Sequence, residues 1–135
     1  MGTVKLTYGQ IIASTEAINT LMTSDNITYG TGLKIQKNAG VLQKFLEEYQ
    51  TEEKKLIDKY YEKDEEGNLV QAENGGYKLK GELINEYVAD RKTLDNFEVE
   101  ARLYKLSFDD VKDVKIKPIL ISTIDYMIEG LPDEE

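Results

Sequence analysis

The spacing of apolar residues predicts that most of this chain is helical. The longest periodic stretch contains no proline and predicts one helix over about residues 34–62. A helix of that length spans roughly 40 Å, too long for a small globule to enclose, so we expect it to pair with a second helix over about residues 81–97. The apolar positions of the two stripes are Leu42, Phe45, Tyr49, Leu56 and Tyr60 in the first helix, and Leu83, Ile84, Tyr87, Val88, Leu94 and Phe97 in the second.

Alternation of apolar and polar residues predicts short strands on both sides of the helical pair. Residues 4–8 alternate near the N-terminus, and residues 99–103 alternate after the second long helix. We expect these two strands to pair with each other. A further short strand is predicted over residues 114–116.

Local signals predict two shorter helices. Thr7 followed by Gln10 is the pattern of a capping box, and it predicts a helix over about residues 8–22. Pro118 suits the first turn of a final helix, which Gly130 and Pro132 would end. The face of that helix would carry Ile121, Ile124 and Ile128.

The segment between the two long helices predicts a β-hairpin. Residues 69–72 and 77–80 have the composition of short strands, and the intervening ENGG, residues 73–76, is a strong turn sequence. We find no internal repeat in the sequence.

Together these elements predict an α+β fold that is mainly α. We expect a single domain in which residues 33–97 form a helical arm with the β-hairpin at its tip, at about 68–80. Residues 1–32 and 98–135 would form the base, with short strands and a C-terminal helix.

Composition narrows the chemistry. The chain has 26 acidic and 17 basic residues, a net charge of −9, which disfavours direct binding to nucleic acid. It has no cysteine and no histidine, which excludes disulfides, Cys/His zinc sites and a histidine base. The longest apolar run, PILISTIDYMI, is too short and too polar to span a bilayer. Since no nucleophile motif appears either, we expect a non-enzymatic protein without a cofactor, a metal or a membrane segment.

The stretch EKDEEGNLVQAE, which begins at Glu62, has part of the spacing of an EF-hand calcium loop. Asp64, Gly67 and Glu73 fit the third, sixth and twelfth positions of that loop. The first ligand position is normally Asp, whereas Glu62 is one methylene longer, and Val70 supplies no side-chain oxygen. We therefore favour an acidic turn over a calcium site.

A second candidate is the stretch YGTGLKIQKN, residues 29–38. Gly30 and Gly32 precede the predicted helix start, and Lys34 and Lys37 lie one turn apart. Free backbone N–H groups at a helix N-terminus attract anions, so these four residues are a candidate anion or ligand site. The stretch lacks both the P-loop and the dinucleotide-binding patterns, and a flexible connection into the helix is the alternative.

Tyrosines provide the third candidate, because the chain has nine of them and no tryptophan. Tyr60, Tyr61 and Tyr77 converge on the predicted hairpin, with Lys78 and Lys80 beside them. Tyrosine with mixed charge is a common composition of protein interfaces, so these five are candidate partner-binding residues. The alternative is that Tyr60 and Tyr77 form a small core that closes the tip.

One stretch resembles a known family. The sequence EEYQTEEKKLIDKYYEKDEEGN, with GGYKLK after it, resembles small phage and prophage proteins of low-GC bacteria, of which the domain-of-unknown-function family DUF1617 is the nearest. The resemblance covers roughly residues 33–105, including GLKIQKN and EVEARL. It implies a helix, an acidic turn with a hairpin and a return helix, and it carries no catalytic residues.

The resulting prediction is a phage-encoded binding protein that antagonises or modulates a host or phage protein, such as a defence or replication factor. One alternative is a virion tail or capsid accessory or assembly protein. Another is an oligomer that sequesters a phosphate-bearing small molecule. We expect it in the host bacterial cytoplasm, or in the virion under the first alternative. Two long apolar stripes also favour self-association, as in a coiled coil.

Overall fold

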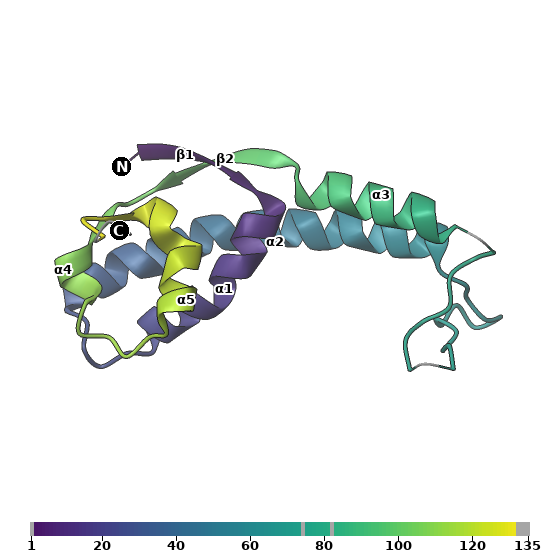
Figure 1. Ribbon diagram of the computed structural model, residues 1–135, viewed down its shortest axis with the longest axis horizontal. Coiled ribbons are helices and arrows are strands. Elements are labelled where there is room, and N and C mark those ends of the chain that lie inside the picture. The colour runs from purple at the N-terminus through teal and green to yellow at the C-terminus, as the bar shows by residue number, and fades with distance from the viewer. Residues whose placement is uncertain (1, 74, 82, 132–135) are drawn as a thin grey trace. The chain divides into compact units, whose positions relative to one another are not determined.

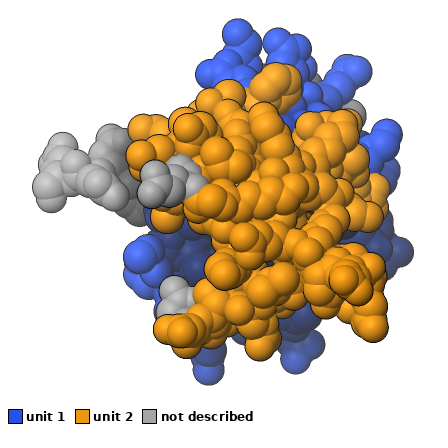
Figure 2. All heavy atoms as spheres, turned by 90° about the vertical axis from the view of Figure 1, so that its right-hand side faces the viewer, with its two compact units in different colours: residues 1–46, 98–135 blue, residues 47–97 orange. Residues whose placement is uncertain are grey.

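The computed structural model describes residues 2–73, 75–81 and 83–131 (Figure 1). It confirms an α+β fold that is mainly α. The chain divides into two compact units, coloured separately in Figure 2: unit 1 comprises residues 1–46 and 98–135, and unit 2 comprises residues 47–97.

Helix α2 (Tyr29–Tyr60) belongs to both units, so the compact units divide the chain at a different point from the predicted arm and base. The division falls after Leu46 rather than near residue 33, because Ile35 and Leu42 of α2 are buried in the core of unit 1. The helix also begins before the predicted residue 34. The glycines that predicted a loop there lie in its first turn.

Unit 1 is built on a strand pair and a capped helix. Strand β1 (Gly2–Thr7) pairs antiparallel with β2 (Glu98–Leu103), from Gly2 opposite Leu103 to Thr7 opposite Glu98, which confirms the predicted pairing. Thr7 then caps α1 (Tyr8–Met22). The Gln10 N–H donates to Thr7 Oγ1 at 3.1 Å and the Thr7 N–H donates to Gln10 Oε1 at 2.8 Å, so the predicted capping box is present.

The core of unit 1 joins segments from both ends of the chain. Inward residues of α1 and α2 meet the inner face of the strand pair and the C-terminal segment. Removing these side chains from water is the main favourable term in the folding of this unit. The apolar residues with relative exposure of 2% or less are Leu6, Ile11, Ala17, Leu21, Ile35, Leu42, Ala101, Leu103, Leu106, Val111, Ile124 and Met127.

The C-terminal part differs from the single helix that was predicted. Its elements are β3 (Leu106–Ser107), α4 (Phe108–Val111), α5 (Pro118–Ile121), the 3₁₀ helix η1 (Ser122–Met127) and β4 (Ile128–Glu129). Pro118 does occupy the first turn of α5, but Ile124 has non-helical angles (φ −120°, ψ 18°) and breaks the run. Ile128 instead lies in β4, which pairs parallel with β3. The strand predicted over residues 114–116 is wrong, and the predicted helix stop at Pro132 lies outside the described residues.

Unit 2 contains the C-terminal part of α2 and the helix α3 (Ile84–Asp95), which lie side by side in Figure 1. Helix α3 begins and ends slightly inside the predicted range 81–97. None of its residues is fully buried, so its contacts with α2 are made by half-buried side chains at its edge.

The segment between α2 and α3 is a closed arrangement of three short extended stretches rather than a single hairpin. The Glu62 N–H donates to Lys78 O at 2.8 Å, the Lys78 N–H to Val70 O at 2.8 Å, and the Val70 N–H to Glu62 O at 3.1 Å. We call this cycle of Glu62, Val70 and Lys78 the backbone ring. Around it lie three isolated antiparallel bridges: Tyr61 with Leu79, Lys63 with Leu69, and Gln71 with Tyr77.

The ring residues are spaced eight apart. The hydrogen-bonding pattern of the backbone therefore repeats every eight residues, although the sequence shows no internal repeat. Gly67 (φ 84°) and Gly75 (φ 87°) occupy equivalent turns, also eight apart, and only glycine takes this conformation without strain. The Lys80 N–H donates to Tyr60 O at 2.7 Å and closes the arrangement on the last residue of α2. The predicted pairing of residues 69–72 with 77–80 is thus one of three equivalent pairings, and its turn includes residue 74, which lies outside the described residues.

Candidate functional site

Tyrosine hydroxyls hold α3 to the unit 2 part of α2. Tyr49 OH donates to Asp95 Oδ1 at 2.8 Å, and Tyr60 OH donates to Asp90 Oδ2. Burial, followed by the hydrogen bond to Asp95, raises the pKa of Tyr49 to about 12. The hydrogen bond to Asp90 is the largest cause of a raised pKa at Tyr60. Both tyrosines therefore stay protonated and act as donors at neutral pH.

Arg91 is the second polar link between the two helices. Its guanidinium pairs with Glu53, donates to Tyr87 OH at 3.2 Å and lies 5.7 Å from the centroid of the Tyr49 ring. Such a planar fork can bond and stack at once, which lysine cannot do. The helix pair of unit 2 is therefore held largely by aromatic and charged contacts.

Three tyrosine rings meet where α2 ends. The Tyr87 ring contacts Tyr60 and Tyr61 edge to face, with centroids 5.7 and 5.3 Å away. Tyr60 is only 4% exposed, which places it in a small core rather than on an open surface, although it was a candidate partner-binding residue. Tyr61 is half-buried in the same cluster.

The other three candidate partner-binding residues lie on the surface. Tyr77 is 54% exposed, so it does not belong to the small core. Lys78 Nζ lies 3.7 Å from Glu62 Oε2, and Lys80 Nζ lies 3.5 Å from Asp58 O. All three project from the last extended stretch of the arrangement around the backbone ring.

Two residues of α3 are also exposed, although the sequence pattern placed them in a buried stripe. Ile84 and Val88 lie one turn apart and are each 56% exposed. The helical period correctly grouped them with Tyr87 in one apolar stripe. The period alone does not show which residues of that stripe face α2. We call Tyr77, Lys78, Lys80, Ile84 and Val88 together the unit 2 surface.

The stretch with calcium-loop spacing forms a tight turn. Asp64 Oδ1 accepts the N–H groups of Glu66 and Asn68, each at 2.9 Å, and the Gly67 N–H donates to Asp64 O at 3.0 Å. The Asp64 carboxylate, which would be the ligand at the third position of a calcium loop, is therefore used to order the backbone. Over the described ranges, no group of three or more Asp, Glu, His or Cys residues is placed to hold a metal ion.

The predicted anion site at residues 29–38 is helical throughout. Gly30 and Gly32 lie in the first turn of α2, where the Gly32 N–H donates to Thr28 O at 2.9 Å. Lys37 lies two turns further along, with Nζ 5.8 Å from the centroid of the Tyr104 ring. The structure therefore does not gather the glycines and Lys37 around one point, and Lys34 is exposed on the helix.

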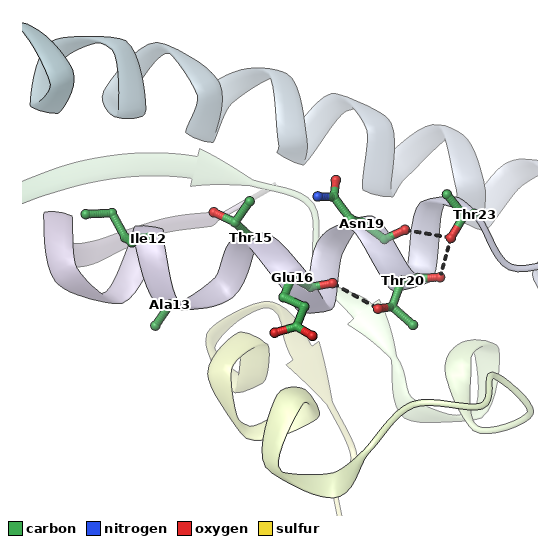
Figure 3. A pocket seen from close by; sticks show the side chains of 7 residues that line it. All are labelled: Ile12, Ala13, Thr15, Glu16, Asn19, Thr20 and Thr23. Atoms are coloured by element: carbon green, nitrogen blue, oxygen red, sulfur yellow. Dashed lines mark hydrogen bonds between the residues drawn. The ribbon is translucent and has the colours of Figure 1, made fainter. Parts of the chain in front are cut away.

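A hollow of about 620 Å³ along α1 is lined by residues of that helix and by its C-cap, Thr23 (Figure 3). Its threonine hydroxyls are engaged with the backbone: Thr20 donates to Glu16 O and Thr23 to Asn19 O, both at 2.9 Å. Glu16 is its one titratable residue. A single exposed carboxylate without a partner acid or base does not make a catalytic site.

No family model, curated protein or solved structure matches this chain. The resemblance to small phage proteins therefore stays a prediction. In the part of the chain that the structure describes, no helix combines the length and the apolar character that crossing a membrane requires.

Proposed function

We propose that the protein is a non-enzymatic binding protein that contacts another protein through the unit 2 surface. The observation that carries this proposal is the exposure of Ile84 and Val88 on α3, a helix without one fully buried residue. Apolar side chains one turn apart on an open helix face are typical of protein-binding sites, and unit 2 also exposes Tyr77.

The charges of unit 2 favour a basic partner. Several of its cations are already paired within the unit: Lys59 with Asp90, Lys63 with Asp58, Lys78 with Glu62 and Arg91 with Glu53. In contrast, no ion pair within the described ranges involves the exposed acids Glu65, Glu66, Glu73 and Glu86. Residues 47–97 carry 14 acidic and 8 basic side chains, so the net charge of unit 2 is negative, and a partner with cationic residues around an apolar centre would complement it.

The resemblance to phage proteins supplies the biological setting of this proposal. The partner would be a host or phage protein in the bacterial cytoplasm, such as a defence or replication factor, and binding would block or modulate it. The alternative of a virion accessory protein has the same surface requirement. It differs in that the protein would be present in purified particles.

Affinity capture with matched variants tests the proposal. The full chain is immobilised and exposed to host lysate with and without phage infection, and the captured proteins are quantified by mass spectrometry. We expect Ile84→Gln/Val88→Gln to lose a partner that Ile119→Gln retains, since Ile119 is 73% exposed in unit 1. Retention of every captured protein by the double variant, or equal loss from the control, would contradict the proposed surface.

A further inference from the structure

A second hollow, in unit 1, has the features of a ligand site. It measures about 380 Å³, within the range of small-molecule sites, and α2, the end of β2 and the residue after that strand line it. Lys37, Gly40, Val41 and Lys44 are spaced three, four and seven residues apart, so they lie on one face of α2. Arg102 and Tyr104 form the opposite wall.

The two walls are fixed to each other by a buried amide. Asn38 is 1% exposed, its Nδ2 donates to Tyr104 O at 2.9 Å, and its Oδ1 accepts the Tyr104 N–H at 2.8 Å. Tyr104 lies between strands β2 and β3. The Asn38 amide bonds its backbone N–H and C=O there, in place of the neighbouring strand that would bond them within a sheet. A hollow held in this way is preformed, so a ligand would not have to order it.

The charge of the hollow opposes that of the whole protein. Three of its lining residues are cations, Lys37, Lys44 and Arg102, and none is acidic, although the chain carries a net charge of −9. None of the three takes part in an ion pair with another described residue. Three uncompensated cations around one hollow suit a phosphate ester, which carries close to two negative charges at neutral pH.

The remaining lining suits an apolar or planar body attached to that phosphate. Val41 and the Tyr104 ring provide apolar surface, and Lys37 Nζ lies near the face of that ring. At Gly40 an added Cβ would meet nothing within 4 Å, so the floor of the hollow is open. We propose that this hollow binds a small organic phosphate of about the size of a mononucleotide.

This site is distinct from the one that the glycines at the start of α2 predicted. The two share Lys37, but Gly30, Gly32 and Lys34 do not line the hollow. Lys34 is nevertheless an exposed lysine of the same helix in the same unit, so it provides a charge-matched control.

Calorimetry on the full chain tests the proposal with adenosine 5′-monophosphate, ribose 5-phosphate, adenosine and inorganic phosphate as probes. We expect a phosphate ester to bind, inorganic phosphate to bind more weakly and adenosine not to bind, because both the charge and the body contribute. Replacing one cation, Lys44→Gln, should weaken the binding of the ester roughly tenfold, and Lys34→Gln should leave it unchanged.

A second pair of variants tests the location without changing charge. Gly40→Met would fill the floor of the hollow and should abolish binding, whereas Gly30→Met, in the first turn of the same helix, should not. Thermal melting confirms that each variant is folded before titration. Absence of binding by both phosphate esters would overturn the proposal. So would equal weakening by Lys44→Gln and Lys34→Gln, because the attraction would then come from general charge rather than from this hollow.

Discussion

The side chain of Asn38 bonds both backbone groups of Tyr104, a residue 66 positions away in the sequence, at 2.9 and 2.8 Å. The amide acts there as a strand would, because it offers one donor and one acceptor at the spacing of a peptide group. It also joins the N-terminal half of α2 to the end of the strand pair. One buried polar side chain thus supports the fold of unit 1 and the shape of its basic hollow.

Removing this amide should be costly. Asn38→Ala leaves the N–H and C=O of Tyr104 without partners in a partly buried place, and we expect it to lower the free energy of unfolding by about 3 kcal/mol. Asn19→Ala, at an exposed position of α1, is the matched control and should change it by less than about 0.5 kcal/mol. Urea denaturation followed by circular dichroism measures both, and equal losses would argue against the structural role of Asn38.

Two glycine substitutions should change stability in opposite directions. Gly40 lies inside α2 with open space around its Cβ position, so Gly40→Ala should stabilise the protein by about 0.5–1 kcal/mol. Gly67 has φ 84°, which alanine adopts only with strain, so Gly67→Ala should destabilise unit 2 by about 1–2 kcal/mol. Thermal melts of the two variants, with hydrogen exchange to localise the effect, check the signs. Destabilisation by both would mean that the Gly40 site is less open than described.

Tyr49 should make the protein less stable in alkali. Its pKa is raised from 10.0 to about 12 in the folded state, so between these values the folded protein retains a proton that the unfolded chain has lost. The contribution is complete below pH 10, falls as pH rises from 10 to 12, and amounts to roughly 2 kcal/mol. Tyrosinate absorbance should show late-titrating groups, one of which is missing in Tyr49→Phe, and unfolding at several pH values gives the slope. Ionisation of all nine tyrosines in a single transition near pH 10 would contradict this expectation.

The Arg91–Glu53 pair should be worth more than a surface ion pair. Both side chains are 30% exposed, and Arg91 also contacts Tyr87 and Tyr49. A double-mutant cycle of Glu53→Gln and Arg91→Met should give a coupling energy of about 1 kcal/mol. The exposed pair Lys55–Glu52 should give less than about 0.5 kcal/mol in the same experiment. A coupling energy no larger than in the control would mean that the Arg91–Glu53 pair adds no more than a surface ion pair to the contact between α2 and α3.

Local signals account for the parts of the fold that the sequence predicted well. The capping box at Thr7 and the periodicity that follows gave both ends of α1, and alternation gave the partners β1 and β2. The early start of α2 was missed because Gly30 and Gly32 disfavour a helix by themselves, whereas packing of Ile35 overrides that preference. The break at Ile124 was missed because its side chain is apolar and in phase with a continuing helix.

The sites were harder to predict because they depend on contacts between distant residues. Tyr60 and Tyr77 carry the same side chain, but only the position of Tyr87 shows that the first is buried. The basic hollow needs Asn38 and Tyr104 side by side, and no spacing in the sequence indicates that. The sequence signal that we find for the backbone ring is the spacing of Gly67 and Gly75, eight residues apart. This signal is too weak to predict the ring.

The backbone ring has an evolutionary consequence. Peptide groups rather than side chains make its three central hydrogen bonds, and the chain returns from residue 80 to the carbonyl of Tyr60, where it left α2. Exposed side chains of the segment between Tyr60 and Lys80 can therefore be replaced with little effect on helices α2 and α3. Such a construction lets the exposed side chains vary within a lineage while the framework that carries them stays the same.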